Sequence, residues 1–126
     1  AFKNQLNETA KTFSALYDLP ELNHHLLEGL QFPTDLKDHI QFVFFESDLY
    51  TDRVKKRYGI TEEVLNKQGI EYVKYNVRSM DKLSQVLEVL TFGSFVQYYL
   101  AVKNNVKMME IPWVDYFKEQ IYALYM

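Results

Sequence analysis

The fold of this chain is decided by residues 40–75, IQFVFF-ESDLYTDRVKKRYGITEEVLNKQG-IEYVKY. The runs at 40–45 and 70–75 are short, apolar and rich in β-branched and aromatic residues, which predicts two strands. The residues between them have a helical pattern that ends at Gly69, where a left-handed helix terminus favours glycine. A strand, a helix and a second strand in this order predict a crossover unit in a parallel sheet.

Several residues could begin the helix of this unit. Ser47, Asp48 and Thr51 are each a candidate N-cap, and Thr61 is a candidate second cap inside or after the helix. The turn at Ser47 and Asp48 follows the carboxyl end of a strand, where open α/β sheets bind ligands. No glycine-rich phosphate loop stands there, so this turn alone indicates no particular ligand.

A first helix is predicted upstream of this unit. Apolar residues recur at helical spacing over residues 2–17, and the helix should end near Asp18, just before a Leu-Pro pair. Glu8 lies on a separate, polar face of this helix. Taken by itself, Glu8 is a solvated carboxylate paired with Lys11 or Thr12.

Pro20 and Glu21 suit the first turn of a second helix. Its buried side is a row of leucines: Leu22, Leu26, Leu27 and Leu30. His24 and Glu28 share another face, one turn apart. Neighbouring His24 and His25 point about 100° apart on a helix, so they do not predict a metal site. His24 is then either a surface side chain or a general acid or base, because histidine titrates near neutrality.

The longest periodic segment runs from Met80 to about Asn104, with Ser79 or Asp81 as its cap. Within it, the glycine of residues 91–94 predicts a kink or close packing, since glycine weakens a helix interior.

A last helix should open at Pro112 and run to about Leu124. Its apolar residues recur at helical spacing and are predicted to face inward: Val114, Phe117, Ile121 and Leu124. Lys118 lies on this helix and, taken by itself, is a solvated lysine.

The composition is that of a soluble globular protein of one domain or part of one, with 126 residues, 48% hydrophobic and 25% charged. The net charge of −3 argues against binding to nucleic acid. No apolar run approaches the ~18–20 residues that span a bilayer, so no membrane contact is expected. The absence of a signal pattern and of cysteine fits a cytoplasmic protein.

Two strands and four or five helices do not complete a layered α/β domain. Sheets usually contain more strands, and both faces of a parallel sheet need cover. The pattern therefore predicts a helix-rich α/β fold with an incomplete sheet. Either a partner chain or further residues of a longer chain would complete it.

Three motifs resemble a known family: Lys3-Asn-Gln-Leu-Asn-Glu-Thr-Ala-Lys11, Pro20-Glu-Leu-Asn-His24 with Glu28-Gly29, and Tyr99-Leu-Ala101 with Phe117-Lys118. They resemble the C-terminal sugar isomerase (SIS) domain of bifunctional phosphoglucose/phosphomannose isomerases, over nearly the whole chain. The resemblance implies an αβα sandwich on a parallel sheet, of which residues 1–126 are a single, truncated C-terminal SIS domain. It also implies a homodimer and an N-terminal SIS domain in the same protein.

The resemblance also implies a reaction: glucose 6-phosphate or mannose 6-phosphate is interconverted with fructose 6-phosphate through a cis-enediol, without cofactor or metal. Glu8 would be the base that moves a proton between C1 and C2. His24 would assist ring opening and reach the neighbouring subunit's site. Lys118 would lie near the ring oxygen of the substrate. The Ser/Thr loops that hold the phosphate would belong to the N-terminal domain.

Some positions depart from the family pattern. Thr9 and His25 stand where asparagine is common, Gln97 stands where serine is expected, and residues 107–109 replace a turn that lines the site. The preference between glucose and mannose therefore stays open. The alternative function is a non-catalytic SIS module that binds a sugar phosphate or supports dimerisation. Entry of solvent deuterium into the sugar would distinguish the two.

Overall fold

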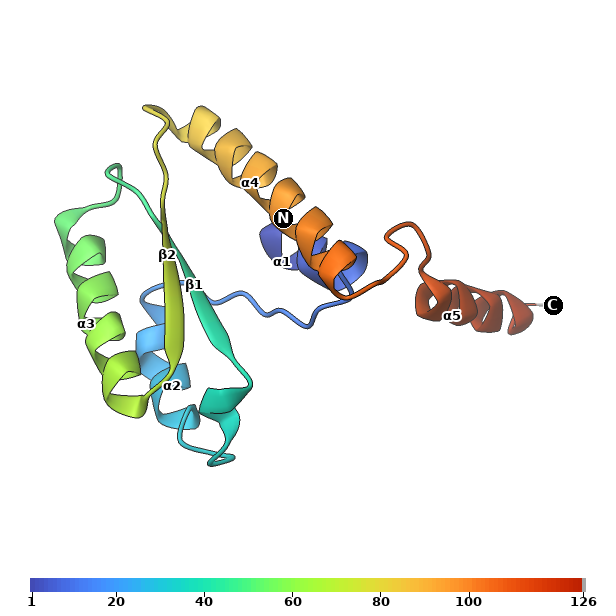
Figure 1. Cartoon of the computed structure of the whole chain (residues 1–126), viewed down its shortest axis with the longest axis horizontal. Helices are drawn as coiled ribbons and strands as arrows, with labels where there is room; N and C mark the ends of the chain where they lie inside the picture. Colours follow the sequence, from blue (N-terminus) through green and yellow to red (C-terminus); the bar gives the residue numbers. More distant parts are fainter. Residues whose placement is uncertain (126) are drawn as a thin grey trace. The chain divides into compact units, whose positions relative to one another are not determined.

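A computed structural model describes residues 1–125 (Figure 1). The fold is α/β, rich in helix, with one short parallel sheet of two strands, as predicted. In chain order the elements are α1 Phe2–Asn4, the π-helical turn η1 Gln5–Thr9, α2 Glu21–Gly29, the 3-10 turn η2 Leu36–Asp38, β1 Gln41–Glu46, α3 Asp52–Gln68, β2 Glu71–Asn76, α4 Lys82–Lys103 and α5 Pro112–Ala123.

The chain forms two compact units. The sheet unit comprises Leu16–Glu88 and contains both strands. The terminal unit comprises Ala1–Ala15 together with the chain from Val89 onward.

In the sheet unit, β1 and β2 pair in parallel, from Gln41 opposite Glu71 to Glu46 opposite Asn76. This confirms both predicted strands to within one residue. The connecting helix α3 runs unbroken for 17 residues and ends at Gly69, whose φ of 70° is the predicted left-handed terminus. Thr51 occupies the N-cap position of α3, and Thr61 lies inside the helix rather than at a second cap.

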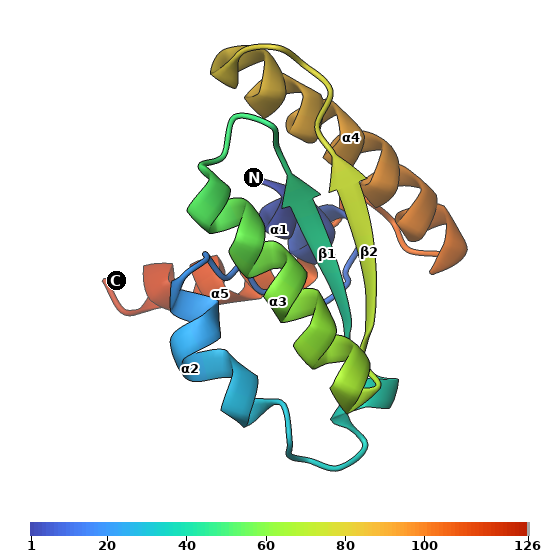
Figure 2. The same ribbon diagram turned by 90° about the vertical axis from the view of Figure 1, so that its left-hand side faces the viewer.

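The core of the sheet unit lies between the strands and the helices on one side of them. Figures 1 and 2 both show α2 and α3 on that side. Four buried residues form its centre: Leu30, Phe44, Leu65 and Ile70. Phe42 and Tyr72 pack on this cluster, whereas Val43 and Val73, one position along each strand, retain 36% and 44% of their accessible surface. This alternation follows from the two-residue period of a strand, and each fully buried side chain stabilises the unit by about 1.5–3 kcal/mol.

In the terminal unit, α1 and η1 pack against the middle of α4. The Gln5 amide nitrogen donates to the Leu90 carbonyl and to Ser94 Oγ, both at 3.2 Å. Gly93 is buried beneath Gln5, and a Cβ atom on Gly93 would come within 2.0 Å of the Gln5 Oε1 atom. The close packing predicted at residues 91–94 is therefore confirmed, and α4 continues through this point without a break.

The predicted extent of the first helix is wrong. Helical structure ends with η1, and Lys11 has a left-handed φ of 53°, so the chain does not continue as a helix to Asp18. The Asn7 side chain explains this ending: its amide donates to the Ser14 carbonyl at 2.8 Å and accepts from the Ser14 N–H at 2.9 Å. A short polar side chain thus takes up backbone groups that a longer helix would have paired internally.

The predicted inward face of the last helix is also wrong within the described chain. Each of its four apolar residues is exposed, and Phe117 retains 62% of its accessible surface. Helical spacing predicts a helix with an apolar face but does not identify what covers that face. Over residues 1–125, no helix has both the length and the apolar character needed to cross a membrane.

The loop between β2 and α4 is closed by two carboxylates. Asp81 accepts hydrogen bonds from the Ser84 N–H at 3.0 Å and from Ser84 Oγ at 2.6 Å, which confirms Asp81 as the cap of α4. Glu88 accepts from the backbone N–H groups of Ser79, at 2.8 Å, and Arg78, at 2.9 Å. Hydrogen bonds from Ser79 and Arg78 lower the pKa of Glu88 to about 2.

We expect Glu88 to make the stability of the sheet unit depend on pH. Because its folded pKa of about 2 lies below the ordinary value of 4.5, its contribution is complete above pH 4.5 and is lost as the pH falls toward 2. The urea midpoint of Glu88→Gln should therefore fall less between pH 7 and pH 3 than that of the wild type. Glu63→Gln, at an exposed position of α3, is the control. A Glu88→Gln profile parallel to the wild-type profile would contradict this assignment.

Two glycines in helix interiors should respond oppositely to alanine. Nothing lies within 4 Å of a Cβ on Gly59, so Gly59→Ala should stabilise the protein by about 0.5–1 kcal/mol. Gly93→Ala gains the same helix propensity, but the new methyl group displaces Gln5 and breaks both its hydrogen bonds. We expect a net loss of about 1–3 kcal/mol in urea unfolding. Equal stabilisation by the two substitutions would show that Gln5 does not pack tightly on α4.

Candidate functional site

An open pocket of about 470 Å³ lies at the first turn of α2 in the sheet unit. It is lined by Pro20, Glu21, Asn23, His24, His25 and Arg57. All of these belong to residues 20–25 except Arg57, which comes from the middle of α3. His24, selected from the sequence, is thus an exposed side chain at a cavity and not part of the core.

Asn23 attaches α2 to α3 beside this pocket. Its amide nitrogen donates to Thr61 Oγ1 at 2.6 Å, and its Oδ1 atom accepts from the Arg57 guanidinium at 3.4 Å. Thr61 is fully buried, and its hydroxyl donates to the Arg57 carbonyl at 2.7 Å. Asn23, the residue immediately before His24, is therefore held through both the nitrogen and the oxygen of its side-chain amide. These two bonds fix the backbone that carries the His24 imidazole.

The two adjacent histidines have different surroundings. His25 Nδ1 lies 2.9 Å from the Glu21 carboxylate, one turn earlier on α2. The rings of His24 and His25 meet edge to face, with centroids 4.6 Å apart. Within residues 1–125 the His24 imidazole makes no hydrogen bond, so both its nitrogens are available to a ligand.

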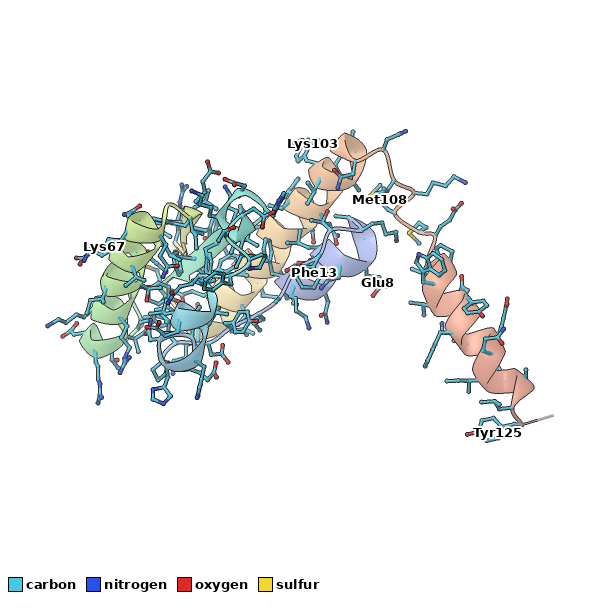
Figure 3. All side chains as sticks on the ribbon, turned by 90° about the horizontal axis from the view of Figure 1, so that it is seen from below. Glu8, Phe13, Lys67, Lys103, Met108 and Tyr125 are labelled. Carbon is cyan, nitrogen blue, oxygen red and sulfur yellow. The ribbon has the colours of Figure 1, made fainter. Side chains whose placement is uncertain are left out.

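Glu8 lies in η1, in the terminal unit. Its carboxylate is exposed and points away from the ribbon (Figure 3). The predicted partners are engaged elsewhere: Lys11 Nζ donates to the Glu8 backbone carbonyl, and Thr12 Oγ1 donates to the Ala10 carbonyl at 3.1 Å. Within residues 1–125 the Glu8 carboxylate has no ion pair. π-Helical turns occur frequently at functional sites, and the left-handed Lys11 that follows costs about 1–2 kcal/mol.

Lys118 lies on α5, also in the terminal unit, and is exposed. Its ammonium group forms no ion pair with any described residue. Glu8 and Lys118 therefore belong to one compact unit, and His24 with its pocket belongs to the other.

A second, smaller cavity of about 200 Å³ lies at the carboxyl ends of the two strands, where the sequence placed the turn at Ser47 and Asp48. Ser47 Oγ accepts from the Leu49 N–H at 3.0 Å and donates to Gln85 at 2.7 Å. Tyr58 donates to the Phe45 carbonyl at 2.9 Å. Burial is the largest cause that raises the pKa of Tyr58, and the neighbouring Tyr50 raises it further. These two hydroxyls are used to hold the fold, so the cavity offers little for catalysis.

Sequence reasoning missed Arg57 and Asn23 as site residues. The only local signal was the helical spacing of Arg57 and Thr61, which are four residues apart on α3. The contacts of Thr61 and Arg57 with Asn23 join α2 and α3 across 38 and 34 positions of sequence. No periodicity in either helix specifies that contact.

In a comparison with protein families, the sequence model of the bacterial phospho-glucose isomerase C-terminal SIS domain matches residues 1–121. The chain belongs to this family. The match begins before η1 and includes the α2 pocket and Lys118, so one family description covers both compact units.

Curated relatives of this SIS domain bear the name bifunctional phosphoglucose/phosphomannose isomerase. The proteins of Thermoplasma acidophilum and Thermoplasma volcanium are 28% and 29% identical to it over 120 residues, and that of Aquifex aeolicus is 22% identical. Each alignment covers 95% of this chain but only 37–38% of the relative. The chain thus spans little more than a third of the relatives' length. No solved structure matches it.

Replacing Asn23 should test how α2 is held. Asn23→Ala leaves the buried Thr61 hydroxyl without its donor and frees the Arg57 guanidinium, so we expect a loss of about 1–3 kcal/mol in urea unfolding. Asn66→Ala is the control, because Asn66 is exposed and its bond to Tyr72 is 3.4 Å long; its effect should stay within about 0.5 kcal/mol. Similar midpoints for both variants would contradict the role of Asn23.

Proposed function

We propose that this chain is the C-terminal SIS domain of an aldose–ketose isomerase that interconverts glucose 6-phosphate or mannose 6-phosphate with fructose 6-phosphate. The observation that carries the proposal is the exposure of Glu8 and His24. Both side chains lie outside the core, and neither forms an ion pair within the described residues. The relatives, which are named phosphoglucose/phosphomannose isomerases, support the same reaction. Burial of both residues in the core would have argued against it.

Glu8 is the proposed base. Its carboxylate takes the proton from C2 of the open-chain aldose, which leaves an enediol across C1 and C2, and the protonated carboxyl then returns the proton to C1. An unpaired carboxylate suits this task, because an ammonium partner would stabilise its charged form and weaken it as a base. Lys11 donates to the Glu8 backbone carbonyl and leaves the carboxylate unpaired.

His24 is the proposed acid and base for ring opening. One imidazole nitrogen takes the proton from the O1 hydroxyl while the ammonium group of Lys118, the proposed neighbour of the ring oxygen, supplies one to that oxygen, so no net proton is consumed. Because the imidazole has no protein partner in the described chain, both of its nitrogens are available for these transfers.

The assembly belongs to the same proposal. Residues 1–126 would form a single C-terminal SIS domain, paired with an N-terminal SIS domain of the same protein in a cytoplasmic homodimer. Large exposed apolar side chains such as Trp113 and Phe13 support the existence of protein contacts, because extended apolar patches commonly mark interaction surfaces.

The test is the substitution Glu8→Gln in the complete protein. Removal of the base should lower kcat by about 10²–10⁴-fold with the fold intact, and solvent deuterium should no longer enter the sugar at C2. Glu63→Gln, which is exposed on α3, should leave kcat unchanged. Near-normal turnover of Glu8→Gln would exclude this mechanism. Binding of fructose 6-phosphate to the wild type without deuterium exchange would instead support the non-catalytic module.

A further inference from the structure

Arg57 is the permanent cation of the His24 pocket. A guanidinium carries five N–H donors and stays charged at all physiological pH values. One donor makes the 3.4 Å bond to Asn23, and the others have no acceptor within residues 1–125. The one carboxylate that lines this pocket, Glu21, lies 2.9 Å from His25. Arg57 therefore forms no ion pair with the carboxylate that lines this pocket.

The neighbouring basic residues of α3 lack this setting. Arg53 and Lys56 are exposed, and Lys55 lies 3.9 Å from the Asp48 carboxylate. Arg57 alone among these four is partly buried, lines a cavity and is held by a second helix through Asn23. A guanidinium held in place loses less conformational entropy when it binds, and its planar fork matches the paired oxygens of a phosphate or a carboxylate.

We propose that Arg57 binds an anionic oxygen of the sugar-phosphate substrate in the His24 pocket. This inference rests on the proposed isomerase function and adds a substrate-binding residue to it. The pocket volume of about 470 Å³ lies in the range of small-molecule sites. Two groups of the substrate carry such an oxygen. One is the phosphate, to which Arg57 would add a contact besides those of the Ser/Thr loops that the family resemblance implies, and the other is the oxygen at C1 or C2 that gains charge as the enediol forms.

Steady-state kinetics of Arg57→Gln in the complete protein distinguish these two oxygens. If Arg57 holds the phosphate, KM should rise by at least about 10-fold with kcat little changed, and inorganic phosphate should inhibit more weakly. If Arg57 stabilises the oxygen of the enediol, kcat should fall by about 10–100-fold with KM unchanged. Either result supports the proposal. Arg53→Gln, with the same change four residues earlier, is the control, and values for Arg57→Gln within twofold of it overturn the proposal.

Asn23→Ala separates binding by Arg57 from its support of α2, because this variant keeps the guanidinium and loses the clamp. If Asn23→Ala reproduces the whole kinetic defect of Arg57→Gln, Arg57 acts only through α2 and the proposal is overturned. If Arg57→Gln does not fold, Arg57→Lys takes its place, since it keeps the charge without the planar fork. Arg57→Lys should then raise KM or lower kcat by a smaller factor than is expected for Arg57→Gln, and wild-type kinetics for Arg57→Lys would overturn the proposal.

A binding measurement keeps this inference distinct from the proposed function. If the wild-type protein isomerises no sugar phosphate, the proposed function fails, and Arg57 is then judged by titration with inorganic phosphate, followed by NMR of the His24 ring. A saturable shift that disappears in Arg57→Gln supports anion binding at Arg57. No shift in the wild type, or the same shift in Arg57→Gln, overturns it.

Discussion

Parallel strands cannot be joined by a tight turn, because the chain must return to the end of the sheet where the first strand began before the second strand can start. Here α3 makes that return between β1 and β2. The face of α3 that lies toward the sheet carries Leu65 into the core. Thr61 and Arg57, one and two turns earlier, meet Asn23 of α2. The place of the His24 pocket thus follows from the way in which two strands are connected.

The parts of the fold that were predicted correctly depend on neighbours in sequence. The two strands, the left-handed end of α3 at Gly69 and the Asp81 cap are each specified by a few consecutive residues. The first helix was predicted too long because Asn7 bonds the backbone of Ser14, a competition that apolar spacing does not register. The partners of Arg57 went unrecognised for a related reason, since they depend on how two helices meet.

The candidate site residues divide in the same way. Glu8 and His24 were selected by motif, and the structure adds what the motif lacks, namely that the charged side chains near them are engaged by other groups. Lys11 bonds the Glu8 backbone carbonyl, and Glu21 pairs with His25. Both arrangements are set by local geometry, a left-handed residue after η1 and a spacing of one turn on α2. Lys11 and Glu21 thus find partners without using the Glu8 carboxylate or the His24 imidazole.

This arrangement bears on the departure of His25 from the family pattern. With asparagine at position 25, Glu21 would lack the imidazole that it contacts in this chain. With His25 present, the Glu21 carboxylate has a partner on its own helix, and Arg57 lines the same cavity without an ion pair to that carboxylate. The contact of His25 thereby engages the Glu21 carboxylate without using His24 or Arg57. A residue one position away from the proposed acid thus takes up the nearby carboxylate, and within the described residues both nitrogens of His24 stay without a hydrogen-bond partner.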